Sequence, residues 1–165
     1  MIKPLFQRVV VAYNGSQSSL HTVLYAILMA KVYKCSVKAV SVVDTASIKY
    51  LTLKKFMVSQ ESDSVSQNLE SDCVKNLAYV TELAKSKGVK IETEIRKGAV
   101  WSEIISAADE FKADLILLGG AKNLNRLSTL SHDSISSQDS EIIGSAHCSV
   151  MVVREPYVEQ KFKLI

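Results

Sequence analysis

Short apolar runs and longer amphipathic segments alternate along the chain. Five runs predict β-strands, at residues 9–13, 37–43, 89–95, 114–118 and 150–153. The run at 9–13 is rich in β-branched residues and does not alternate, which is typical of a strand buried on both faces of a parallel sheet. The run at 89–95 alternates apolar and polar positions, which indicates a strand with one exposed face near a sheet edge.

Apolar residues spaced three and four apart predict helices between these runs. We expect helices at about 17–33, 69–87, 101–111 and 137–144. Strands that alternate with helices predict an α/β fold, in which right-handed crossovers place helices on both faces of a parallel sheet.

The length of 165 residues fits a single domain, predicted over residues 1–165 with its core at 8–154. Between residues 45 and 67 the periodicity is lost and polar residues accumulate, so we expect an irregular loop with at most a helical turn at 50–57. Residues 155–165 show weak structure signals and form a predicted C-terminal tail. Its apolar residues either pack on the body or on a second copy, or the tail is disordered.

Composition excludes several classes of protein. With 47% apolar and 22% charged residues the chain resembles a globular domain, not a disordered segment. A net charge of +3 is too small to predict a nucleic-acid partner. The three cysteines are far apart and lack the spacing of metal ligands, and no apolar run approaches the ~20 residues that cross a membrane. We therefore expect a soluble cytoplasmic protein with no metal, no membrane partner and no nucleic-acid partner.

The sequence lacks the common motifs of enzyme active sites. It contains no G-x-G-x-x-G, no P-loop and no G-x-S-x-G elbow. No histidine has an acidic partner placed by sequence to complete a triad. We predict no catalytic residue and no enzyme activity. A remote alternative is that residues 13–19 form a phosphate loop like that of ATP-pyrophosphatases, of which they keep one glycine and a later serine.

In a parallel α/β sheet, ligands bind beyond the carboxyl ends of the strands. In this chain those ends fall at residues 13–16, 43–44, 96–98 and 119–122. A ligand site, if present, is expected there.

Five segments in register resemble the universal stress protein family. They are 9–16 (VVVAYNGS), 42–44 (VVD), 97–105 (KGAVWSEII), 114–119 (DLILLG) and 145–154 (SAHCSVMVVR). The resemblance covers residues 8–154. It implies a five-stranded parallel sheet in the order 3-2-1-4-5, of the adenine nucleotide alpha hydrolase-like type. It also implies a homodimer that pairs through the last strand, Val150–Val153.

Family members that bind ATP carry the pattern G-x2-G-x9-G-[S/T] after the fourth strand. Here Gly119 matches the first glycine, Lys122 stands at the second, and Ser136-Ser137 match the third glycine and its hydroxyl residue. The intervening segment has 13 residues instead of nine, and Asn14 replaces the aspartate of the family. The resemblance therefore implies a degenerate nucleotide site at six positions, listed in chain order: Asn14, Val43, Gly119, Lys122, Ser136 and Ser137.

Two interpretations of this site remain open. In the first, the phosphate cradle is lost and the chain is a stress-response or signalling homodimer without a cofactor. In the second, the charge of Lys122 and the hydroxyls of Ser134, Ser136 and Ser137 form an altered anion site for ATP with Mg²⁺. Residues other than glycine do not freely adopt positive φ angles, which disfavours a close backbone wrap around phosphate. We predict the first and keep the second as the alternative.

Overall fold

The computed structural model of the chain describes residues 2–56, 58–120 and 135–165. Five parallel strands form one sheet in the order β3-β2-β1-β4-β5. The strands are β1 (Arg8–Ala12), β2 (Ser36–Val43), β3 (Glu92–Lys97), β4 (Leu115–Gly119) and β5 (Ser149–Val153). This order confirms the predicted fold class, although β3 begins three residues later than the alternating run.

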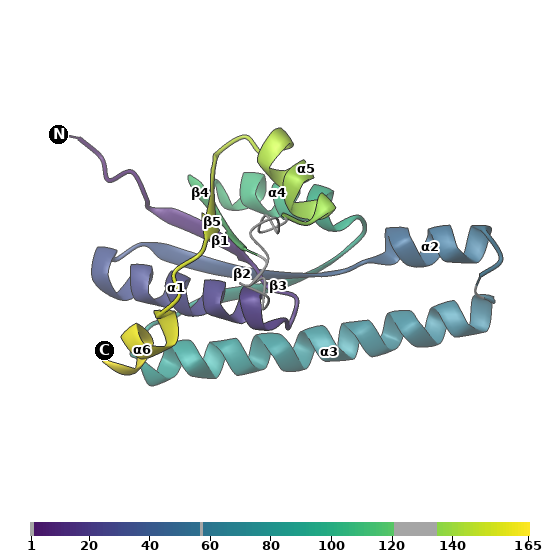
Figure 1. Cartoon of the computed structure of the whole chain (residues 1–165), viewed down its shortest axis with the longest axis horizontal. Coiled ribbons are helices and arrows are strands. Elements are labelled where there is room, and N and C mark those ends of the chain that lie inside the picture. The colour runs from purple at the N-terminus through teal and green to yellow at the C-terminus, as the bar shows by residue number, and fades with distance from the viewer. Residues whose placement is uncertain (1, 57, 121–134) are drawn as a thin grey trace, which may run out of the picture.

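Helices cover both faces of the sheet (Figure 1). On one face lie α1 (Gln17–Tyr33), the 28-residue α3 (Ser59–Ser86) and α6 (Val158–Lys163). On the other face lie α4 (Val100–Phe111) and α5 (Ser137–Ser145). β1 contributes Val9 and Val11 to the first core and Val10 to the second, and all three side chains are completely buried. This central position explains why the run at 9–13 is continuously apolar.

The segment at 45–67, expected to be an irregular loop, is mostly helical. It contains α2 (Thr45–Leu53) and the first turns of α3. The Asp44 side chain caps α2 by accepting a hydrogen bond from the backbone N–H of Ser47 (3.0 Å). The prediction was wrong because this part of α3 buries no side chain, so its sequence lacks the apolar period by which a packed helix is detected.

The C-terminal segment, predicted to have weak structure, forms α6 after a turn. Val158 and Phe162 are buried against α1, and the ammonium of Lys87 lies 4.8 Å from the centre of the Phe162 ring. The packing of apolar tail residues on the body is thus observed for two residues, whereas Tyr157 and Leu164 remain exposed.

No helix in the described residues is both long enough and apolar enough to span a lipid bilayer.

Candidate functional site

A cavity of about 440 Å³ lies beyond the carboxyl ends of the central strands, where α/β sheets bind their ligands. Its apolar wall comes from β2, α4, β4 and α5: Val40, Val42, Val100, Ile104, Leu118 and Ile142. Its polar wall comes from the residues after β1 and from the start of α5: Asn14, Ser16, Ser18, Ser19, Ser136, Gln138 and Asp139. A pocket with one apolar and one polar side fits a small organic molecule that has both characters.

The turn between β1 and α1 is held by Asn14. Its side-chain oxygen accepts hydrogen bonds from the backbone N–H of Ser16 (3.0 Å) and from Oγ of Ser19 (2.7 Å). Ser16 then caps α1 by accepting from the N–H of Ser19 (3.2 Å). The side-chain oxygen of Asn14 thus holds the turn in shape, as the carboxylate oxygen of an aspartate would. The side-chain amide of Asn14 is uncharged, however, whereas the aspartate that the resemblance implies at this position is negatively charged.

The start of α5 forms the opposite polar wall. Ser136 caps this helix by accepting a hydrogen bond from the backbone N–H of Asp139 (3.1 Å). Gln138 Oε1 accepts from the backbone N–H of Trp101 in α4 (3.1 Å). This hydrogen bond joins the first turns of α4 and α5 and fixes that side of the cavity.

Asp139 is the single charged side chain among the described residues that line the cavity. Burial raises the pKa of its carboxyl group, and a hydrogen bond with Ser136 partly opposes that increase. The first turns of α1, α4 and α5 each contribute residues to the lining, and helix N-termini carry partial positive charge. The cavity therefore attracts an anion through its helix ends, but a built-in carboxylate already occupies the N-terminus of α5.

Gly119 ends β4 where α1 passes close by. A Cβ atom at this position would lie 2.8 Å from the carbonyl oxygen of Ser18 and 2.9 Å from Oγ1 of Thr22. These distances are far shorter than van der Waals contact. The close packing of α1 on β4 is therefore enough to require a glycine at position 119.

The structure brings together three of the six residues that the sequence singled out. Asn14, Gly119 and Ser136 line the cavity. Ser137 is the first residue of α5 but is not part of the lining. Val43 is buried and is not part of the lining either, and its carbonyl accepts a hydrogen bond from the N–H of Gly98 (3.1 Å). Lys122 lies outside the described residues.

Sequence reasoning missed Asp139, Gln138 and most of the apolar wall. Asp139 follows the cap residue Ser136 by three positions, a spacing at which a carboxylate is favourable in the first turn of a helix. That signal was present in the sequence, but it does not show that the carboxylate faces a cavity. The residues of the apolar wall could not be singled out in the sequence, because apolar residues that line a cavity are of the same types as those that pack in the core.

Comparison with known proteins identifies the family of the chain. The model of the universal stress protein family matches residues 5–154. The chain belongs to the universal stress protein family. It is 32% identical over 157 residues to universal stress protein MJ0531 of Methanocaldococcus jannaschii, a match that covers 94% of this chain and 86% of that protein.

Solved structures of universal stress proteins share its fold, the adenine nucleotide alpha hydrolase-like fold. One, determined in complex with cAMP, has a TM-score of 0.62 and 22% identity and covers 92% of this chain and 99% of its own. Another, from Arabidopsis thaliana with AMP bound, has a TM-score of 0.60 and 15% identity and covers 93% and 94%. At these identities the likeness extends to the fold alone.

Proposed function

We propose that this universal stress protein is a non-enzymatic stress-response or signalling protein whose cavity does not bind ATP. The observation that supports this proposal most directly is the position of Asp139. Its carboxylate lies in the first turn of α5, beside Ser136, where the resemblance places the end of the phosphate loop.

Electrostatics gives the reason. Two like charges about 4 Å apart repel by roughly 4 kcal/mol at an effective dielectric constant of 20, and a polyphosphate carries several negative charges. The described lining residues include no lysine or arginine that would offset this repulsion. A small uncharged ligand would meet no such penalty, and its hydroxyl or amino groups could donate to Asp139.

The absence of turnover is part of the same proposal. Two of the three histidines lie in the described residues, and both have acidic partners. His21 Nε2 lies 2.8 Å from Glu159, and His147 Nδ1 lies 3.0 Å from Asp109. Neither histidine lines the cavity, so neither is positioned to act on a molecule bound there.

A nucleotide sensor with an altered phosphate site is the second candidate. It is favoured by the convergence of three helix N-termini on one cavity and by the neighbours solved with cAMP and AMP. A single phosphate needs fewer compensating charges than a triphosphate.

Calorimetric titration with ATP and Mg²⁺ tests the proposal. We expect no measurable heat of binding for the wild-type chain at millimolar ATP. Asp139→Asn keeps the shape of the side chain and removes its charge, so it should increase ATP affinity by about tenfold or more. Asp109→Asn, which removes an acidic group outside the lining, serves as the matched control and should change nothing.

Wild-type binding of ATP at micromolar concentration, unaffected by Asp139→Asn, would contradict the proposal. Parallel titrations with AMP and with adenosine separate the two candidates. Binding of AMP that is as tight as that of adenosine, or tighter, supports the sensor, whereas binding of adenosine alone supports a cavity that rejects phosphate.

A further inference from the structure

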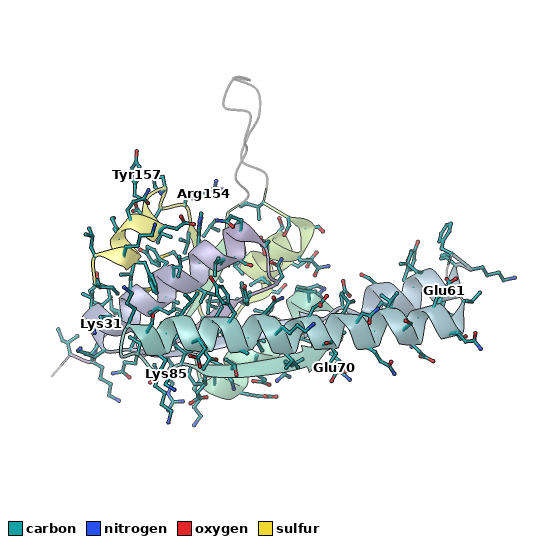
Figure 2. All side chains as sticks on the ribbon, turned by 90° about the horizontal axis from the view of Figure 1, so that it is seen from below. Lys31, Glu61, Glu70, Lys85, Arg154 and Tyr157 are labelled. Carbon is teal, nitrogen blue, oxygen red and sulfur yellow. The ribbon has the colours of Figure 1, made fainter. Side chains whose placement is uncertain are left out.

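A two-helix arm projects beyond the end of the sheet. We define the arm as α2 (Thr45–Leu53), the described residues 54–56 and 58 that follow it, and Ser59–Leu69 of α3. In Figures 1 and 2 these helices run side by side away from the strands, with Glu61 near the far end. Farther along α3, Glu70 pairs with Lys97 of β3 (2.8 Å), so the helix is in contact with the sheet at this residue.

The arm has almost no core of its own. Among its described residues, Ile48 alone is buried. Four large apolar side chains near the tip are instead exposed, two of them by more than 70%: Tyr50, Leu53, Phe56 and Val58. A nine-residue helix such as α2 is marginal in water unless an apolar face is packed. The arm therefore presents apolar surface that a partner would cover.

The two halves of the arm carry opposite charge. Residues 45–58 contain Lys49, Lys54 and Lys55 and no acidic residue. Residues 59–69 contain Glu61 and Asp63 and no basic residue. None of these five groups forms an ion pair within the described part of the chain. The ammonium of Lys54 lies 5.8 Å from the centre of the Tyr50 ring, and Glu61 accepts a hydrogen bond from the backbone N–H of Val58 (3.5 Å), but neither contact involves a group of opposite charge.

We infer that the arm docks against the arm of a second copy of this chain. An antiparallel pair about a twofold axis would place the basic α2 of each copy beside the acidic start of α3 of the other. Such an interface is self-complementary, as a twofold contact must be. It would also enclose the four exposed apolar side chains in a bundle of four helices.

The charge pattern favours a second copy over a membrane surface. Anionic lipids attract a surface that is basic throughout. The acidic residues Glu61 and Asp63 follow the basic turn within a few positions, and they would be repelled by the same lipids. A copy of the arm satisfies both signs of charge at once.

This interface is distinct from a dimer through β5. α3 packs on β2 and β3, at one end of the strand order, whereas β5 lies at the other end. The two contacts can therefore be tested separately, and the arm proposal does not depend on the cavity or its ligand.

Sedimentation velocity over a range of concentrations tests the inference. We expect the arm contact to raise the mass of the wild-type chain with concentration, in addition to any pairing through β5, and Phe56→Asp should lower the mass measured at high concentration. Val74→Asp replaces an exposed apolar residue of α3 outside the arm (54% exposed, against 76% for Phe56), and it should leave the association unchanged. Circular dichroism of each variant shows whether its helices are retained.

A charge exchange makes the test specific. Lys54→Glu with Lys55→Glu should prevent association through the arm and lower the mass as Phe56→Asp does, and so should Glu61→Lys with Asp63→Lys. A mixture of these two double variants should regain the wild-type mass, because each arm then meets an arm of complementary charge. Restored association requires that α2 of one copy contacts α3 of another.

Three results would overturn the inference. They are a mass at high concentration that is the same in Phe56→Asp as in the wild type, an equimolar mixture of the exchanged variants that keeps the lower mass, and co-sedimentation with vesicles of anionic phospholipid that Phe56→Asp abolishes. The last result would assign the arm to a membrane surface.

Discussion

At the scale of single residues, Gly119 has two competing explanations. The resemblance to ATP-binding relatives places it at the first glycine of a phosphate loop. The structure gives a reason that requires no ligand, since a Cβ there would approach the backbone of Ser18 and the side chain of Thr22 to within 3 Å. A glycine at this position is therefore compatible with a cavity that has lost its phosphate loop.

We predict that Gly119→Ala lowers the free energy of unfolding by about 1–3 kcal/mol, the usual cost of overpacking. Urea denaturation measures the effect without any ligand. Gly144→Ala is the matched control: it lies in α5 with no atom within 4 Å of an added Cβ, and alanine favours a helix over glycine by up to about 1 kcal/mol. Equal stability of Gly119→Ala and wild type would show that the site relaxes and that packing does not require this glycine.

At the scale of elements, the sequence predicted the helices and strands that pack in the core. The five strands and four helices followed from runs of apolar residues, because each of these elements packs an apolar face. The order of the strands followed from the resemblance to the family. The arm and α6 did not follow. The start of α3 is exposed on nearly every side, and α6 has only six residues, too few to display a period. The cavity could likewise be predicted only in part. Its position follows from where the strands end, but the direction of the Asp139 side chain depends on packing between helices that are distant in the sequence.

Phe162 is the larger of the two buried side chains of α6. Phe162 is 8% exposed and packs with the core beside α1, whereas Leu164 two positions later is 86% exposed. We predict that Phe162→Ala lowers the free energy of unfolding by about 3 kcal/mol, as expected for a buried phenylalanine. Leu164→Ala should change it by less than about 0.5 kcal/mol. Chemical denaturation of both variants checks this, and equal effects would mean that α6 is not docked in solution.

At the scale of the whole molecule, the two edges of the sheet differ in chemistry. β3 carries four charged side chains, Glu92, Glu94, Arg96 and Lys97, and Glu94 forms ion pairs with Lys38 and Arg96 (both 2.7 Å). Charged residues on an edge strand discourage pairing with another sheet. β5 has the sequence SVMVV and carries no charge. Only the β5 edge is therefore suited to pairing with a second chain.

We predict that the sheet forms a homodimer through β5 and that hydrogen exchange reveals it. In a single chain, the amides of β5 that point away from β4 face solvent and exchange rapidly. Pairing with a second β5 would protect them, so protection should extend along Ser149–Val153 at high protein concentration and decrease in alternate residues on dilution. The outward amides of β3 provide the internal control, since they should exchange rapidly at every concentration. Because Phe56→Asp leaves the β5 edge intact, this protection should persist in that variant. Rapid exchange of the outward β5 amides at all concentrations would exclude the β5 dimer while leaving the arm contact to be judged by its own variants.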